Sequence, residues 1–495
     1  MKFIQKYKIQ IHEKQEHILI PYFEETDMKK QLQQLPLESH TSAGLAKDYK
    51  KFGQQTIIIP FQSRSMAITF MPLGLEKKFN LEKLRKQFQG FGKTVKEDYQ
   101  ILLEGLHFKG YSLSQVIETI IKAMYVGAYS FKKDNLSLAS TNRIFAIRDK
   151  LKCEKDSYTM LIIHSENLQY SIEKAMAYGQ CINHARVLGD IPNNYLHVKQ
   201  FTEYAIDLAE HYNLPYEVLG KSELEEFNSG GILGVNAGCE EEPNLISIYY
   251  EGCKGAPVTA LIGKGVMFDS GGYNLKSIGG MDGMKYDMCG AANVLAALEL
   301  IVRQKSKENI ILIIPAVENL ISPSACKMGD VLTTMSGKTV EVYNVDAEGR
   351  LILCDAITYA IKKGSSRLID LATLTYSCHS ALGDEISGIF ANNEKFYEAF
   401  KRKAEEEGEK VWRLPLDSSY HNHLHKTQTA DLINYAPGSG GGASVAACFL
   451  EEFVEPQIPW IHIDFVGPAV KRKENKLQSA GATGAFVASI AALFE

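Results

Sequence analysis

The sequence predicts an α/β protein made of a small N-terminal α/β domain and a larger C-terminal domain, whose mixed and mostly parallel sheet is sandwiched between helices. The 495 residues are 45% hydrophobic and 23% charged, which is ordinary globular composition in a chain long enough for two or three domains. Short apolar runs alternate with helix-length segments, as strands and helices do in α/β folds. A turn-rich stretch at residues 189–194 ends a long helical pattern and separates two regions of different character.

The first region, residues 1–165, is expected to form the small N-terminal domain. Residues 56–59 and 158–163 are rich in β-branched or aromatic side chains and predict strands. Residues 116–124 place apolar side chains at i, i+4 and i+8, which is the stripe of a helix that packs on a sheet. Residues 166–189 contain few helix breakers and predict a helix that connects the two domains.

The second region, residues 190–495, is predicted to hold the larger sheet. Segments 293–303 and 351–362 have helical length and lie between apolar runs, so we expect parallel strands joined by helices. In such sheets, functional sites lie beyond the carboxyl ends of the strands. The apolar runs that predict buried strands are residues 245–250, 258–262, 310–314, 368–371 and 461–465.

Charge and cysteine usage exclude several classes of partner. Lysine and arginine number 54 against 59 aspartate and glutamate, so the formal net charge is −5 and nucleic acid or an anionic membrane is not expected as the main partner. The nine cysteines are scattered without a CxxC pair, which indicates a reducing compartment. No apolar stretch approaches the roughly 20 residues of a membrane helix, and the N-terminus shows no signal peptide. We therefore expect a soluble, cytoplasmic protein.

Two predicted strands, residues 258–262 and 339–343, are each followed by a glycine-containing loop that is rich in charged side chains. Glycine lets the backbone approach a ligand closely. Asp346 and Glu348 are two apart in what we expect to be an extended segment, so their carboxylates would point the same way. The charged residues of these loops are Lys264, Asp269, Lys276, Asp287, Asp346, Glu348 and Arg350.

This set of side chains favours metal-assisted hydrolysis. Clustered carboxylates without a nearby histidine suit divalent cations such as Zn²⁺, Mn²⁺ or Mg²⁺. Two such ions about 3.5–4 Å apart would neutralise the carboxylates and make a bridging water acidic enough to attack a substrate. For any one of these fragments alone, a surface loop of salt bridges is the alternative interpretation.

Taken together, these residues and the string Asn-x-Asp-Ala-Glu-Gly-Arg at residues 344–350 resemble the leucyl aminopeptidase family, the M17 cytosol aminopeptidases. Further motifs occur in the family's order, and the resemblance extends over roughly residues 185–490. It implies a metallo-exopeptidase that hydrolyses the N-terminal residue from peptides, with leucine-type or other neutral side chains. The further motifs are residues 429–434, the glycine run 438–443, residues 460–464 and residues 481–484.

The resemblance assigns five side chains to two divalent metal ions per subunit, Zn²⁺ and/or Mn²⁺. It implies that Asp269 and Glu348 bind both ions and that Asp346 binds the more exchangeable one. Lys264 and Asp287 would complete the tighter site. A lysine ligand must be neutral, which an adjacent dication favours because it lowers the lysine pKa.

Two further side chains are expected to be catalytic. Lys276 would remain a cation and polarise the scissile carbonyl, and Arg350 would hold a bicarbonate ion that acts as general base. The free α-amine of the peptide would bind a metal, which explains why such an enzyme trims only N-termini. The residues expected to bind the substrate are Lys276, Met284, Asp287, Leu374 and Tyr376.

Tyr376 follows Thr373-Leu374-Thr375 at a position where the family usually has glycine. If its ring points inward, the pocket for the first side chain shrinks or gains a polar wall. If the ring turns away, it packs in a neighbouring core or subunit contact. Two other departures, Val345 in place of threonine and Cys289 in place of glycine or serine, affect no expected metal ligand.

The expected partners are peptides with a free N-terminus and further copies of the chain in a homohexamer, with no membrane. The alternative function is a DNA-binding or architectural protein on the same scaffold with secondary peptidase activity. A strong basic stripe would favour that alternative, whereas the net charge of −5 and the dispersed lysines do not. Metal-dependent turnover of an aminoacyl amide distinguishes the two.

Three alternating histidines, His421, His423 and His425, form a possible metal clip. No further ligand lies close to them in the sequence, so we predict a polar surface stretch.

Overall fold

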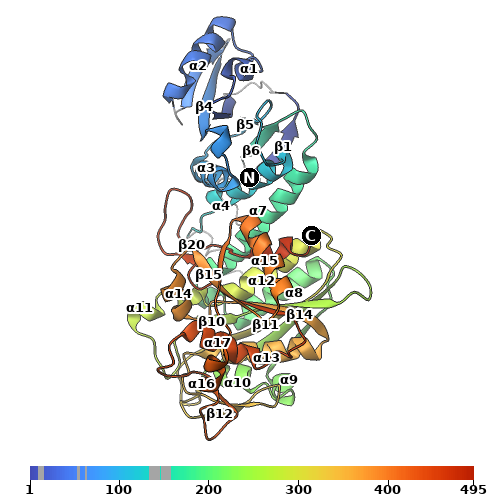
Figure 1. Ribbon diagram of the computed structural model, residues 1–495, viewed down its shortest axis with the longest axis vertical. Helices are drawn as coiled ribbons and strands as arrows, with labels where there is room; N and C mark the ends of the chain where they lie inside the picture. Colours follow the sequence, from blue (N-terminus) through green and yellow to red (C-terminus); the bar gives the residue numbers. More distant parts are fainter. Residues whose placement is uncertain (9–15, 53–55, 62–63, 133–144, 146–157) are drawn as a thin grey trace. The chain divides into compact units, whose positions relative to one another are not determined.

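The computed structural model describes residues 1–495 except for 9–15, 53–55, 62–63, 133–144 and 146–157 (Figure 1). The chain divides into two compact units, both built from strands and helices, so the predicted fold class is confirmed. The first unit comprises Met1–Ser130, the described part of Lys152–Gln180, and Glu474–Ser479; the second comprises the described part of Phe131–Leu151, Cys181–Lys473, and Ala480–Glu495.

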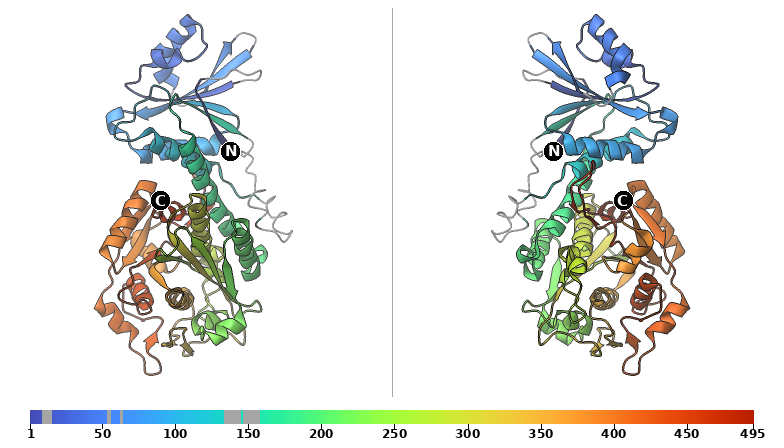
Figure 2. Two further views of the ribbon diagram at one scale, coloured as in Figure 1. Left: turned by 90° about the vertical axis from the view of Figure 1, so that its right-hand side faces the viewer. Right: turned by 90° about the vertical axis from the view of Figure 1, so that its left-hand side faces the viewer.

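The N-terminal unit holds a six-stranded sheet with the order β1-β6-β5-β2-β4-β3. Neighbouring strands run parallel except at the edge, where β3 is antiparallel to β4. Helices cover both faces, α3 and α4 on one and α1 and α2 on the other, and an apolar core fills each side (Figure 2). The elements are β1 Lys2–Lys6, β2 Glu16–Phe23, β3 Thr56–Phe61, β4 Arg64–Gly74, β5 Tyr99–Leu102, β6 Thr159–Ile163, α1 Met28–Leu32, α2 Ser39–Phe52, α3 Leu81–Thr94 and α4 Leu113–Ala128.

The apolar stripe predicted at residues 116–124 lies in α4, where Val116, Ile120 and Met124 are fully buried. Ser112 caps this helix and exchanges hydrogen bonds with Gln115, which satisfies backbone N–H groups that the first turn leaves unpaired. A separate helix, α7 (Gln169–Asp190), occupies the segment for which we expected a connecting helix, and the boundary between the two units falls within it.

The C-terminal unit is built on a nine-stranded mixed sheet with the order β16-β15-β18-β14-β9-β11-β8-β7, in which β10 also pairs with β11. Its centre is parallel, from β18 through β14 and β9 to β11, and the antiparallel pairs lie outside this centre. The strands are β7 Tyr216–Leu219, β8 Asn244–Glu251, β9 Val258–Gly263, β10 Gly265–Asp269, β11 Asn309–Asn319, β14 Ser365–Ala372, β15 Ile386–Ala391, β16 Lys410–Arg413 and β18 Trp460–Asp464.

Helices pack on both faces of this sheet. One face carries α10, α13 and α17, whose apolar side chains share a large buried core with Ala260 and Ile262 of β9. The other face carries α12, which packs on β9, β11 and β14 and contacts α18. The helices are α8 Val198–His211, α9 Lys221–Glu226, α10 Gly230–Asn236, α11 Ile278–Met281, α12 Cys289–Arg303, α13 Glu348–Lys362, α14 Tyr376–Leu382, α15 Glu394–Glu407, α16 Ser418–Leu424, α17 Gly442–Glu451 and α18 Val487–Ala492.

Two glycines allow α12 to approach the strand ends very closely. A Cβ atom at Gly263 would lie 2.4 Å from Val294 Cγ2 and 2.7 Å from Ala291 Cα. A Cβ atom at Gly290 would lie 2.3 Å from the carbonyl oxygen of Leu371 in β14. Any larger residue would push the helix away, so these glycines fix the start of α12 against the carboxyl ends of β9 and β14.

A smaller sheet brings a distant segment to the loop after residue 341. β12 (Val331–Thr333) is antiparallel to β13 (Thr339–Glu341), and β13 is parallel to β17 (Leu432–Ile433). The pairing of Glu341 with Ile433 places Asn434 beside the loop that carries Asp346. The last two short strands, β19 (Val470–Lys471) and β20 (Gly481–Ala482), pair with each other.

The structure also shows the state of the cysteines and whether any described helix could cross a membrane. The eight cysteines within the described residues are free thiols, and Cys153 lies outside those residues. Among the described helices, none has both the length and the apolar character that crossing a membrane requires.

A buried polar network ties β14 to β18 in the centre of the sheet. Asp370 of β14 pairs in register with His462 of β18. The side chains of Asp370, His462 and Trp460 form the network, and all three are fully buried. Trp460 Nε1 donates to Asp370 Oδ2 at 2.6 Å, and His462 Nδ1 lies 2.5 Å from Asp370 Oδ1. Burial acts to lower the pKa of His462, but Asp370 outweighs it and raises the pKa above its ordinary value.

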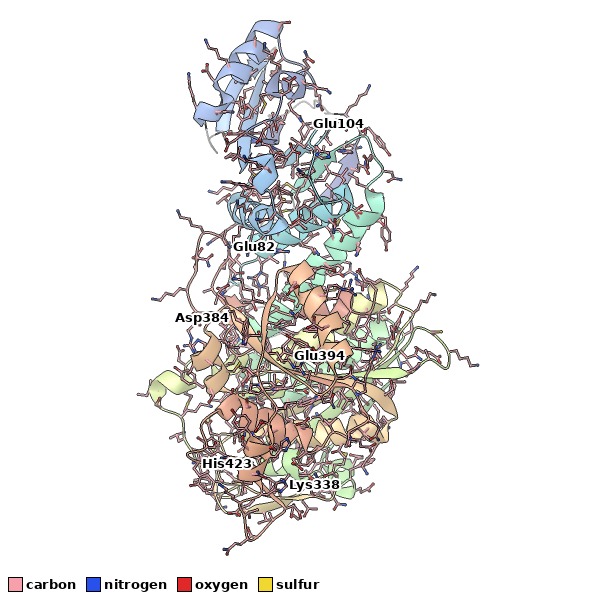
Figure 3. All side chains as sticks on the ribbon, viewed as in Figure 1. Glu82, Glu104, Lys338, Asp384, Glu394 and His423 are labelled. Atoms are coloured by element: carbon pink, nitrogen blue, oxygen red, sulfur yellow. The ribbon has the colours of Figure 1, made fainter. Side chains whose placement is uncertain are left out.

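We expect Asp370→Ala to lower the free energy of unfolding by about 3–5 kcal/mol, because it leaves a buried imidazole and an indole N–H without their acceptor. Urea denaturation of both proteins measures the difference. The control is Asp384→Ala, which removes an exposed partner of His379 (Figure 3) and should cost less than about 1 kcal/mol. Equal effects of the two substitutions would contradict the importance of the buried network.

The same network should make stability depend on pH. Because the folded pKa of His462 is raised, its pairing with Asp370 stabilises fully below the unfolded pKa of about 6.5 and is lost as pH rises through the folded pKa. The cost of Asp370→Asn in unfolding free energy should therefore be larger at about pH 6 than at about pH 9. Urea denaturation across this range tests the expectation, and a cost that does not change with pH would refute it.

Candidate metal centre

The candidate site lies where the central strands of the C-terminal sheet end. Lys264 joins β9 to β10, Asp269 is the last residue of β10, and Asn319 is the last residue of β11. Thr373 directly follows β14. These positions agree with the expectation that a site lies beyond the carboxyl ends of parallel strands.

Two local expectations are wrong. Asp269 was expected in a loop but ends strand β10, which pairs in parallel with β11. Asp346 and Glu348 were expected in an extended segment, whereas Asp346 lies in a turn and Glu348 is the first residue of α13. Their carboxylates nevertheless meet, because the turn reverses the chain and the helix start directs Glu348 back toward Asp346.

Three carboxylates converge at this point. Oxygens of Asp269, Asp346 and Glu348 all lie within 4.8 Å of one another. Lys276 Nζ lies 2.7 Å from Asp269 Oδ2 and 2.5 Å from Asp346 Oδ1, so its ammonium group bridges two of them. The site therefore concentrates negative charge that a cation must balance.

The second lysine, Lys264, is buried and forms ion pairs with Asp287 and Glu348. Lys264 Nζ lies 2.8 Å from Asp287 Oδ2 and 2.8 Å from Glu348 Oε1, and it donates to the carbonyl oxygen of Thr373 at 2.8 Å. The Thr373 hydroxyl donates to Asp287 Oδ1 at 2.7 Å. Both charged groups of the Lys264–Asp287 pair are buried, so this pair is held in one arrangement.

Asn319 holds the carboxylate of Asp269 in place. Its Nδ2 donates to Asp269 Oδ1 at 2.8 Å and to the carbonyl oxygen of Val345 at 3.2 Å, which links the two carboxylate-bearing segments. The backbone N–H of Gly271 also donates to Asp269 Oδ1, at 2.8 Å. Gly271 has φ of +85°, and a Cβ atom there would lie 2.8 Å from Asp346 Oδ1, so the position requires glycine on both counts.

The donor set fits divalent cations. Four carboxylates, those of Asp269, Asp287, Asp346 and Glu348, face two ammonium groups, which leaves excess negative charge in a buried site. Burial, Glu348 and Asp287 raise the pKa of Asp269 well above its usual range, and burial raises the pKa of Asp287 to about 6. The raised pKa values show that these carboxyls hold protons more tightly than usual, which offsets part of the negative charge. Divalent cations bound by the same oxygen atoms would offset that charge instead.

Lys264 fits a metal-ligand role only when a cation displaces its proton. Burial acts to lower the pKa of Lys264, but Asp287 and Glu348 outweigh it and raise the pKa above its ordinary value. A dication placed between the same carboxylates would reverse that balance.

Arg350 lies in α13 with an unused donor. Its Nη1 donates to the carbonyl oxygen of Asn434 at 2.8 Å, and its buried Nε has no hydrogen-bond partner among the described residues. Burial lowers the pKa of Arg350 to about 10, so a nearby anion would stabilise its cationic form. These features fit the bicarbonate ion expected there.

A cavity of about 820 Å³ opens beside the cluster. Asp346 and Arg350 form part of its wall, as do Leu374 and Tyr376, two of the residues that were expected to bind the substrate. Tyr376 is 75% exposed with its ring 5.5 Å from that of His379, so within the described chain it does not pack into a core. Met284, at the start of a short 3-10 turn (Met284–Tyr286), is not among the residues that line this cavity.

Three positioning residues had no assigned role in the sequence analysis: Asn319, Thr373 and Asn434. Asn434 is fully buried, its Oδ1 accepts the N–H groups of Tyr343 and Asn344, and its Nδ2 donates to the carbonyl oxygen of Asn344 at 2.7 Å. Asn319 and Thr373 were detectable as polar residues at the ends of apolar strands. Asn434 lies in the motif 429–434, which gave it no role at this site, and the β13–β17 pairing brings it here.

An α/β unit with carboxylates, lysines and a cavity at the strand ends is an arrangement typical of metal-dependent hydrolases. The catalytic domain of the cytosol aminopeptidase family matches residues 183–491. The chain is also 34% identical to the "Probable cytosol aminopeptidase" of Bacillus subtilis (strain 168), covering 99% of this chain and 98% of that protein. The chain therefore belongs to the cytosol aminopeptidase family, whose members are metal-dependent aminopeptidases.

Solved structures share the fold over nearly the full length. A cytosol aminopeptidase from Coxiella burnetii is 25% identical with a TM-score of 0.78, covering 99% of this chain and 98% of that one. The bottromycin maturation enzyme BotP in complex with Mn is 23% identical with a TM-score of 0.80, covering 97% of this chain and 100% of that one. The similarity thus includes the first 165 residues, where the sequence motifs give no guidance.

Proposed function

We propose that this chain removes the N-terminal residue from peptides by hydrolysis, using two divalent cations, and that it accepts leucine-type or other neutral side chains. The observation that carries the proposal is the convergence of Asp269, Asp346 and Glu348 within 4.8 Å, next to Lys276 and at the edge of the cavity. Carboxylates with this spacing suit cations that share ligands.

Five side chains would hold the cations, Zn²⁺ and/or Mn²⁺. Asp269 and Glu348 would be shared by both, Asp346 would hold the more exchangeable one, and Lys264 and Asp287 would complete the tighter site. When bound, the cations would supply Lewis-acid polarisation and an acidic water. The residues around them already have fixed orientations, because Asn319 and Thr373 hydrogen-bond the carboxylates of Asp269 and Asp287.

Lys276 and Arg350 would act on the substrate itself. The ammonium group of Lys276 would donate to the carbonyl oxygen of the scissile bond and stabilise the negative charge that develops there. The unused Nε of Arg350 would hold bicarbonate as general base. The free α-amine of the peptide would lie beside Asp287, which restricts cleavage to the first residue.

The cavity would receive the first side chain of the peptide. Leu374 contributes an apolar surface, while the glycine-rich stretch from Gly438 to Gly442 also lines the cavity, with Ser439 as its one residue that carries a side chain. Tyr376 adds a ring and a hydroxyl at this wall. We extend the proposal to a cytoplasmic homohexamer, for which the resemblance to the family is the support.

Removal of divalent cations with a chelator should abolish hydrolysis of leucine amide, and Mn²⁺, Zn²⁺ or Co²⁺ should restore it. The physical reason is that the cations would supply the Lewis acid and the acidic water, which Lys276 and the carboxylates cannot replace. Initial rates, measured with metal content determined on the same samples, provide the test. Full activity in a verified metal-free sample would refute the proposal, and tight binding of duplex DNA without turnover would favour the architectural alternative.

The Lys276→Ala variant should retain both cations and lose about 10²–10³ in kcat, because it lacks only the donor to the developing negative charge. Metal content and steady-state kinetics are measured together. The control is Lys285→Ala, which removes a nearby lysine that donates to the carbonyl oxygen of Asp190 and should have little effect on kcat. A Lys276→Ala protein that has lost its cations would contradict the assigned role.

Replacing Tyr376 by glycine should widen the cavity and favour bulky first residues. Each methylene in an apolar pocket changes discrimination by about 1–3 kcal/mol, so the loss of a ring is expected to reorder the preference among Ala, Leu, Met, Phe and Cys-Gly type substrates. Comparison of kcat/KM for the parent, Tyr376→Phe and Tyr376→Gly separates the hydroxyl from the ring. An unchanged order in a folded Tyr376→Gly protein would show that the ring does not select the substrate.

A further inference from the structure

A second group of metal-ligating side chains lies between α16 and α17, apart from the carboxylate site. His421 belongs to α16, and Cys448 and Glu451 lie three residues apart on α17, so they project from the same face of that helix. One ligand atom from each of the three lies within 4.8 Å of the other two. We call these three residues the α16–α17 cluster.

Hydrogen bonds orient the imidazole of His421 within this cluster. Its Nε2 lies 2.9 Å from Glu451 Oε2, and its Nδ1 lies 2.8 Å from Glu452 Oε1. Lys338, labelled in Figure 3, lies 3.1 Å from the other oxygen of Glu452 and keeps that carboxylate charged. One ring nitrogen therefore faces Glu451 of the cluster while the other is held by a carboxylate behind it.

The reason for predicting a polar surface stretch, that no further ligand lies close, does not hold for His421 in the folded chain. No ligand lies near it in the sequence, but α17 supplies a thiol and a carboxylate, the latter 30 residues later. Cys448 is fully buried and the side chain of His421 is 25% exposed, so the cluster has a closed side and an open side. His423 does not belong to it, because its Nδ1 lies 3.1 Å from Lys426 Nζ.

We propose that the α16–α17 cluster binds a divalent transition metal of the Zn²⁺ class through His421 Nε2, Cys448 Sγ and the carboxylate of Glu451. Nitrogen, sulfur and oxygen donors together are typical of Zn²⁺, and three protein ligands leave a fourth position for water. Glu452 would accept the Nδ1 proton of His421, which is the arrangement that orients histidine ligands in metal sites.

Binding exchanges protons for the metal. Without a metal the thiol of Cys448 is protonated, because burial and nearby carboxylates raise its pKa to about 12. On metal binding the thiol would therefore release this proton and bind as the thiolate. The proton between His421 Nε2 and Glu451 is released as well, so the ion replaces the positive charge on the ring. Lys338, Asp417, His425 and Glu452 are further charged or titratable groups around the cluster.

The site would support one wall of the substrate cavity. Tyr420, which precedes His421, lines that cavity, as do residues 442–445 in the first turn of α17. A metal that joins the two helices would therefore fix the separation of two parts of the wall. No residue of the α16–α17 cluster belongs to the carboxylate site, so the two sites can be tested separately.

Cobalt(II) is the probe that separates them. A thiolate bound to Co²⁺ gives a strong charge-transfer absorption in the near ultraviolet, whereas the ligands proposed for the carboxylate site include no sulfur. The full-length protein is titrated with Co²⁺ beyond the equivalents that the carboxylate site takes. We expect this absorption in the parent, its loss in Cys448→Ser, and its persistence in Cys354→Ser, which changes another fully buried helical cysteine.

A second variant, Glu451→Gln, tests the site independently in case Cys448→Ser does not fold. Glu451→Gln keeps the thiol and changes a partly exposed side chain, and it should weaken Co²⁺ binding at this site by about 10-fold or more. Addition of Zn²⁺ to the parent should abolish the absorption and raise the thermal unfolding midpoint more than in Glu451→Gln. The proposal is overturned if the parent shows no thiolate absorption, if Cys448→Ser retains it, or if Glu451→Gln binds Co²⁺ as tightly as the parent.

Discussion

The need to balance negative charge in a buried place governs the structure of the C-terminal unit. Asp269, Asp346 and Glu348 are brought within 4.8 Å of one another, a separation at which carboxylates repel strongly in a protein interior. Lys264 and Lys276 offset part of this repulsion through ion pairs of 2.5–2.8 Å. Because the surrounding segments are closely packed and the carboxylates are hydrogen-bonded, the charges have little room to move apart, which is a condition under which such a site gains affinity for cations.

The rest of the unit keeps these charges in place by close packing and by hydrogen bonds. Gly263 and Gly290 let α12 sit directly on the strand ends, so the backbone that carries Lys264 has no room to shift. Asn319 joins the segments of Asp269 and Val345, and Asn434 fixes the turn that precedes Glu348. The site is thus supported by residues that are themselves uncharged, as expected where orientation matters more than additional charge.

The cavity that is proposed to receive the substrate is shaped by elements outside the central sheet. α14 provides Tyr376, and the loop before α17 provides the glycine-rich lining, so the wall depends on how α16 and α17 pack. The α16–α17 cluster lies at that packing contact. Metal binding at the cluster, as proposed, would therefore act on the shape of the cavity, although the carboxylate site and the cluster share no ligand.

Periodicity and motif order alone predicted the α/β class, the apolar strands and the seven charged residues of the proposed site, because each prediction depends on local pattern and on residues close in the chain. Only the tertiary structure decided that Asp269 ends a strand, because this depends on the pairing of β10 with β11. It also decided that Glu348 begins a helix, because the turn before Glu348 has no clear sequence signature. It alone decided that Asn434 meets Arg350 and that His421 meets Cys448 and Glu451. Those contacts join residues 27 to 84 positions apart, and no local physical property of the chain specifies such a pairing.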